Sequence, residues 1–218
     1  MDRQFHNLRF QKKKLQAMIV KTFAPNDRKK VMAAFQFAKQ KHKGQRRHIG
    51  TAYVIHPIRV AIILLDEVGT WDADVVAAGI LHDVVEDCGT RLKTISSRFG
   101  KRVASFVRIL TRPRGKGESD QEKEQRKKQK LALLARTDGE ARLIKCADIL
   151  DNLRSAADVS WWQWSPLIRR KFPRWQREFQ FAAKFAKEVH PVLYREIVHA
   201  LRVFKIKRLV RGMVRFGF

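Results

Sequence analysis

The sequence predicts an all-α fold in a single domain. Apolar side chains recur at helical spacing along most of the chain, and no segment alternates for long enough to make a convincing strand. Gly and Pro are sparse, at 11 and 6 of 218 residues, so no flexible linker divides the chain. A chain of this length can bury a sizeable core by itself. We therefore expect one domain of packed helices.

The expected helices follow one another along the chain. Asn26 or Asp27 can cap a first long helix that runs to about Lys41. Further helices are predicted over residues 56–67, 72–86, 91–99, 101–111, 121–135, 140–157, 174–188 and 191–211. We expect residues 1–26 to form a basic helix packed on the domain, residues 27–160 to form its core, and residues 161–218 to complete it with aromatic and basic helices.

The segment LHDVVEDC carries the strongest indication of chemistry. It sets His82 and Asp83 one helical turn ahead of Glu86 and Asp87, with apolar neighbours around them. Because residues four apart share a helix face, one turn would offer an imidazole and three carboxylates against the core. Such a group is typical of a metal-dependent hydrolase. Taken alone, the segment is also compatible with a solvated acidic helix end.

Two other segments supply matching side chains. His56 precedes a proline at a helix start, and Asp148 lies on a polar helix stripe with Lys145, Asn152 and Ser155. Two imidazoles and two carboxylates suit a divalent transition metal such as Mn²⁺, whereas zinc more often recruits Cys or three His ligands. We predict a Mn²⁺ site, with Fe²⁺ or Zn²⁺ as alternatives, held by His56, His82, Asp83 and Asp148.

From about Asp27 to Asp158 the chain resembles HD-domain metallohydrolases, and among them the hydrolase domain of the RelA/SpoT alarmone enzymes. The resemblance rests on TAYVIHPIRVA, AAGILHDVVEDCGT, ISSRFGKRVASFVRILTR and ARLIKCADILDNLRS, and most specifically on the acidic pair that follows HD. It implies an HD-domain helical bundle that hydrolyses the 3′-diphosphate of ppGpp or pppGpp, giving GDP or GTP and pyrophosphate. The alarmone synthetase domain would not fit in the remaining residues, so a stand-alone hydrolase is expected.

The resemblance also implies roles for individual residues. Glu86 and Asp87 would orient or deprotonate the attacking water and assist the leaving group. The substrate would lie beside Arg47, His48, Lys145, Asn152 and Ser155.

The chain departs from the family pattern at three positions. His48 stands where a Lys commonly follows the Arg, and Ile149 and Asp151 stand where the common pattern ADRLHN has Arg and His. These changes leave the predicted metal ligands intact but make the guanine preference of the nucleotide pocket less secure than the hydrolysis of a diphosphate. The substrate alternatives are therefore ppApp, NADPH, a nucleoside monophosphate or a pyrophosphorylated RNA 3′ end.

The charge is strongly positive and unevenly distributed. The net charge is +26, yet residues 51–111, which hold most of the expected site, carry seven basic and seven acidic residues. A basic surface attracts polyanions, including a nucleotide with two diphosphates, RNA or an anionic membrane. It is also compatible with a merely solubilising role. A non-catalytic RNA- or membrane-binding protein on the same scaffold is thus a further alternative, against which the complete ligand set argues.

The sequence also bears on the cellular compartment. It shows no cleavable signal pattern and no apolar run long enough to span a bilayer. Cys88 and Cys146 are too few for a disulfide framework, so we expect a cytoplasmic protein.

Overall fold

The computed structural model describes residues 4–47, 50–112, 117, 119–137, 139–158, 179–180 and 182–215, with part of the side chains of the helices after residue 119. These ranges are helical, apart from turns and one isolated antiparallel bridge between Arg46 and Ala52. The elements are α1 (Leu8–Thr22), α2 (Pro25–Lys41), α3 (Ile55–Ile62), the π-helical turn η1 (Ile63–Glu67), α4 (Ala73–Leu81), α5 (Val84–Cys88), α6 (Leu92–Phe99), α7 (Lys101–Leu110), α8 (Asp120–Ala135), α9 (Gly139–Asp158) and α11 (Pro191–Arg215).

The all-α prediction is confirmed, and most predicted helices are found within a few residues of their expected bounds. Of the helix predicted over 174–188, residues 179–180 and 182–188 are helical, and the rest lie outside the described residues. In the part of the chain that the structure describes, no helix combines the length and apolarity needed to cross a membrane.

One predicted helix is wrong in detail, because the helix expected over 72–86 is divided in two. α4 ends at Leu81, His82 and Asp83 form a turn, and α5 begins at Val84. His82 Nδ1 donates to the carbonyl of Gly79 over 2.7 Å, so it uses an acceptor that the next turn of a continuous helix would need. The sequence spacing alone did not reveal this side-chain bond.

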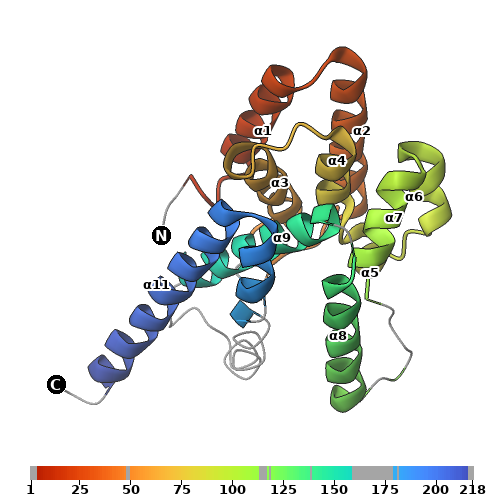
Figure 1. Ribbon diagram of the computed structural model, residues 1–218. Coiled ribbons are helices and arrows are strands. Elements are labelled where there is room, and N and C mark those ends of the chain that lie inside the picture. Colours follow the sequence, from red (N-terminus) through yellow and green to blue (C-terminus); the bar gives the residue numbers. More distant parts are fainter. Residues whose placement is uncertain are drawn as a thin grey trace.

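α9 is the central element of the fold. α1, α2, α3 and α4 lie side by side, and α9 runs across their ends (Figure 1). α9 contacts α3, α4 and η1 on this side, while α7, α8 and α11 also pack on it. One apolar core extends over these helices and includes Ile58, Leu81 and Ile144, each with an exposed fraction of zero. The packing brings polar residues of α3, α4 and α9 to one place.

The close approach of η1 and α4 depends on a glycine. A Cβ added at Gly79 would lie 2.6 Å from Leu64 Cδ1 and 3.6 Å from Val60 Cγ1. Because Leu64 is fully buried, its side chain has little room to give way. Gly79 therefore lets the segments that carry His56 and His82 pack closely against each other.

This contact predicts that Gly79→Ala destabilises the wild-type protein but stabilises a protein that carries Leu64→Ala. In the wild type the new methyl group overpacks the core, and we expect a loss of about 1–3 kcal/mol in the free energy of unfolding. Leu64→Ala alone should cost about 2–5 kcal/mol through the cavity it leaves. In that background Gly79→Ala should stabilise the protein, because it fills part of the cavity and favours the helix. Urea denaturation of the four proteins measures this; equal effects in both backgrounds would contradict it.

Candidate metal centre

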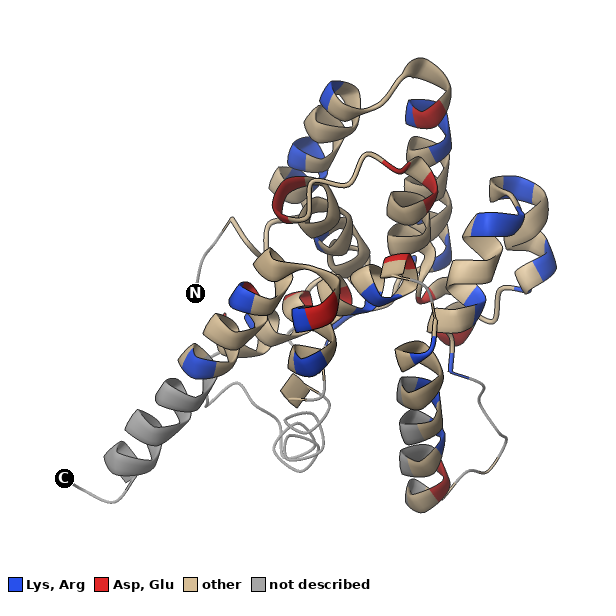
Figure 2. Cartoon of the chain, viewed as in Figure 1, with Lys and Arg blue, Asp and Glu red and all other residues tan. Residues whose placement is uncertain are grey.

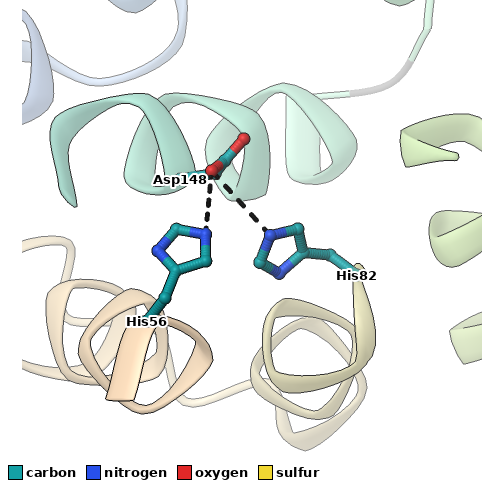
Figure 3. A group of neighbouring side chains, drawn as sticks. All are labelled: His56, His82 and Asp148. Carbon is teal, nitrogen blue, oxygen red and sulfur yellow. Dashed lines mark ion pairs between the residues drawn. The ribbon is translucent and has the colours of Figure 1, made fainter. Parts of the chain in front are cut away.

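Three helical segments aim buried side chains at one point. His56 projects from the start of α3, His82 follows the end of α4, and Asp148 lies in the middle of α9 (Figure 3). One ligand atom from each of the three residues lies within 4.8 Å of the other two. Their ring and carboxylate groups are almost fully buried, so the cluster belongs to the core and not to the solvated surface.

Asp83 adds a second carboxylate to this cluster. Its Oδ2 lies 3.1 Å from His82 Nε2 and 3.7 Å from His56 Nε2. Asp148 Oδ1 is 3.2 Å from His56 Nε2 and 3.8 Å from His82 Nε2. The structure thus brings together all four residues that the sequence predicts as metal ligands.

The donor atoms of the cluster fit a divalent cation. Because His82 Nδ1 is bonded to Gly79, its Nε2 faces the two carboxylates. This Nε2 is buried and has no partner with hydrogen-bond geometry among the described residues, although Asp83 is close. Once His82 gives up its proton, this buried nitrogen and the ionised oxygens beside it form the donor set that a metal ion of mixed N/O preference requires.

The pKa values show that the cluster favours positive charge. Burial alone would raise the pKa of Asp83, but His82 and His56 hold it below its usual value. Burial would likewise raise the pKa of Asp148, but Lys145 and His56 hold it well below the ordinary range. Burial would lower the pKa of His82, yet Asp83 outweighs it and raises this pKa to about 9. The carboxylates are therefore ionised at neutral pH, and a proton or a metal ion can balance them.

The two acidic residues of α5 point to different neighbours. Asp87 Oδ2 lies 2.8 Å from the hydroxyl of Tyr53, and the same hydroxyl is 2.6 Å from Asp83 Oδ2. Asp87 is thereby linked to the metal cluster through a phenol. Glu86 accepts a hydrogen bond from the backbone N–H of Arg112 over 2.9 Å and lies 3.9 Å from Lys130 Nζ on α8.

Two of the predicted substrate residues contact Asp148, and a third contacts one of these two. Lys145 Nζ is 2.7 Å from Asp148 Oδ2, and the amide of Asn152 donates to Asp148 Oδ1 over 2.7 Å. Arg47 donates to Asn152 Oδ1 over 2.7 Å and lies over the ring of Tyr53. These side chains form a polar chain from the loop after α2 to the metal cluster.

The other two predicted substrate residues differ in position. Ser155 is buried, and its hydroxyl accepts a hydrogen bond from Arg59 over 2.7 Å. In this arrangement Ser155 belongs to the interior between α3 and α9 and is not brought to the cluster. His48 lies outside the described residues.

The site also contains four residues that were not among the predicted site residues: Tyr53, Arg59, Lys130 and Asp151. Asp151 accepts from His56 Nδ1 over 2.6 Å and forms a buried ion pair with Arg59. Tyr53 contacts Asp83, and Lys130 lies near Glu86. The spacing held a signal for three of them: Tyr53 and Arg59 are each three residues from His56, and Asp151 is three residues after Asp148, one helical turn away.

Known proteins resemble this chain in sequence and in structure. The HD domain family model matches residues 34–166. The guanosine-3′,5′-bis(diphosphate) 3′-pyrophosphohydrolase MESH1 of Mus musculus is 36% identical over 159 residues, which are 72% of this chain and 83% of that protein. A protein of that activity from Aquifex aeolicus is 33% identical over 184 residues, 84% of this chain but 23% of its own length. The chain thus spans less than a quarter of the bacterial relative and most of the animal one.

A solved structure agrees with these matches. It is described as a metazoan orthologue of SpoT that hydrolyses ppGpp, and it superposes with a TM-score of 0.67 at 31% identity, covering 79% of this chain and 94% of its own. A structure from Listeria monocytogenes superposes with a TM-score of 0.55 at 27% identity, covering 69% of this chain. The helices, the buried His and Asp cluster and these matches agree: the chain belongs to the HD-domain family, in the branch that contains the guanosine bis(diphosphate) 3′-pyrophosphohydrolases.

Proposed function

We propose that this protein is a divalent-metal-dependent hydrolase that removes the 3′-diphosphate of ppGpp or pppGpp, with release of pyrophosphate and GDP or GTP. The observation that carries the proposal is the buried cluster of His56, His82 and Asp148, whose ligand atoms lie within 4.8 Å of one another. The relatives that are named for this activity supply the substrate class.

In this proposal His56, His82, Asp83 and Asp148 hold the metal, and Mn²⁺ is the ion that suits their nitrogen and oxygen donors. A bound divalent cation would polarise a phosphate oxygen and make a water molecule more acidic. The residues of this chain supply the remaining functions. The lowered pKa values of Asp83 and Asp148 keep both carboxylates ionised and ready to bind a cation at neutral pH.

The hydrolysis itself requires movement of protons at two oxygens. A water oxygen forms a bond to the phosphorus attached to the ribose 3′-oxygen, the bond between that phosphorus and the 3′-oxygen breaks, and the 3′-oxygen takes up a proton. We propose that Glu86 and Asp87 orient and deprotonate the water and assist the leaving group. Tyr53, which bridges Asp83 and Asp87, keeps its phenolic proton because burial and both carboxylates raise its pKa. Its single O–H, which lies within reach of both carboxylates, can donate to either one and so keep Asp83 and Asp87 close together.

The substrate would be held by the cationic and amide groups beside the cluster. Arg47, Lys145 and Asn152 form the polar chain described above, and their charges suit a diphosphate. Ser155 and His48 remain predictions. The relatives named above are described as alarmone hydrolases, and they give no support for nucleic acid as a partner. Because the two cysteines are free, we further propose a cytoplasmic location.

The first test is the reaction itself. Purified protein with Mn²⁺ should release pyrophosphate from ppGpp, and removal of the metal by a chelator should abolish the reaction until Mn²⁺ is returned. Chromatography of the products, with ppApp and GMP as parallel substrates, measures this. Turnover of ppApp in place of ppGpp would correct the base preference, and turnover of GMP alone would overturn the proposal.

The second test separates metal binding from catalysis. Glu86→Gln should keep its metal affinity and lower kcat by about 10²–10⁴-fold, because the lost group acts on a proton in the transition state. Asp148→Asn should lose metal affinity and activity together. Glu140→Gln is a matched control on α9, because Glu140 pairs with Arg102 at the surface. Calorimetric metal titration and kinetics are measured for each variant; loss of metal affinity in Glu86→Gln would contradict the division of roles.

A third test concerns the buried lysine beside Glu86. Burial, with Lys145 nearby, lowers the pKa of Lys130 to about 8 from its usual 10.5. Between these values the unfolded chain binds more protons than the folded protein, so wild-type stability should rise with pH. Lys130→Met should therefore stabilise the metal-free protein by about 1–3 kcal/mol at pH 7, and this gain should disappear toward pH 10. Urea denaturation across this range measures it; a pH-independent difference would contradict the prediction.

A further inference from the structure

A buried ion pair lies directly behind His56. Arg59 Nε and Nη2 lie 2.6 and 3.0 Å from the two carboxylate oxygens of Asp151, which is a bidentate arrangement. Asp151 has an exposed fraction of zero, and Arg59 is 3% exposed. A charged pair in such an environment is costly unless every group is satisfied, so its presence here calls for a reason beyond packing.

The remaining groups of this pair are also satisfied. Arg59 donates to Ser155 Oγ over 2.7 Å and to the backbone carbonyl of Phe5 over 3.1 Å. Its guanidinium carbon lies 4.0 Å from the centre of the Phe5 ring. The guanidinium is thus fixed from several sides, and Asp151 is fixed with it.

The carboxylate of Asp151 meets the imidazole of His56. Asp151 Oδ2 accepts a hydrogen bond from His56 Nδ1–H over 2.6 Å, so Nε2, on the opposite side of the ring, is the nitrogen whose lone pair a metal ion would use. That Nε2 is the atom that lies near Asp148 and Asp83. A metal-binding histidine commonly donates its other ring N–H to a carboxylate, which fixes both its tautomer and its orientation.

This arrangement includes Asp151, one of the residues in which the chain departs from the family pattern. The pattern ADRLHN would place His at position 151, where this chain has Asp151. An aspartate alone in this fully buried place would leave an unpaired charge, and Arg59, one helical turn after His56, provides the counter-charge. Asp151, the residue that departs from the pattern, is therefore paired with Arg59 on α3.

We propose that Asp151, held by Arg59, is a positioning residue that fixes His56 in the tautomer and orientation that present Nε2 to the metal. This inference rests on the metal site of the proposed function, but it concerns metal affinity and not substrate choice. Neither Asp151 nor Arg59 touches the metal or the substrate in this proposal. Both act through His56.

The test compares two variants in which the buried charges are removed together. Arg59→Met/Asp151→Asn keeps an oxygen acceptor for His56, whereas Arg59→Met/Asp151→Leu has a side chain of similar size without one. Neither variant leaves an isolated buried charge, so both should fold, which circular dichroism checks. Calorimetry with Mn²⁺ on metal-free protein should give an affinity about 10–100-fold weaker for the Leu variant than for the wild type. The Asn variant should lie closer to the wild type.

A matched control removes another ion pair of the same helix. Arg154 of α9 bonds Glu67 of η1 over 2.9 Å, away from His56. Arg154→Met/Glu67→Gln should leave Mn²⁺ affinity unchanged. If the Arg59 and Asp151 pair were merely structural, the Asn and Leu variants would bind Mn²⁺ equally, and this result would overturn the inference.

A second measurement requires no variant. In the Zn²⁺-loaded wild type, nitrogen-15 NMR of the histidine rings should show His56 with a proton on Nδ1 and the metal on Nε2; coordination through Nδ1 would overturn the inference. A protein that shows this ring state and the expected order of affinities, but releases no pyrophosphate from ppGpp, would refute the proposed function alone. A wild type that binds no divalent metal would refute both.

Discussion

The structure depends on the neutralisation of ionised side chains that are buried in a helical core. α9 carries Asp148 and Asp151 one turn apart, and they meet the two ring nitrogens of His56 from opposite sides. Burial of each carboxylate is unfavourable by several kcal/mol unless a counter-charge is in reach. Arg59 provides this counter-charge for Asp151, while Asp148 faces the cluster that is expected to bind a cation. The crossing of α3 over α9 is therefore determined by charge pairing as well as by apolar packing.

The break between α4 and α5 determines how the HD and ED residues divide their work. If the helix were continuous, His82 would lie over Glu86 on one face. Instead, the bond from His82 to Gly79 turns the chain, and the two acidic residues of α5 reach different neighbours. Asp87 approaches the cluster through Tyr53, and Glu86 is held on the side of α8 by Arg112. The local geometry thus favours metal binding by His82 and Asp83 and a separate role, not as metal ligands, for Glu86 and Asp87.

Most of the fold could be predicted from the sequence, because a long helix with regular apolar spacing can be recognised from its own residues. The convergence of His56, His82, Asp83 and Asp148 was also predictable, since three segments each offered ligands at helical spacing. The buried contact between Arg59 and Asp151 was not, because it joins residues 92 positions apart and depends on how α3 packs on α9. For the same reason Asp151 looked like a departure from a pattern, although in the structure it has a partner. The helix break at His82 depends on a side-chain bond that spacing does not encode.

The charges around the site address two opposing requirements. A divalent cation needs an excess of carboxylates, whereas a substrate with diphosphates is repelled by them. The fold separates these demands in space, because Asp148 is buried and cationic side chains from several segments lie around the acids. These are Arg47 from the loop after α2, Arg112 after α7, Lys130 on α8 and Lys145 on α9. Lys and Arg are also frequent on the outer helices (Figure 2), so positive charge surrounds a centre that holds buried carboxylates. A polyanion would be drawn toward the site by the outer charges and would meet a cation only at the centre.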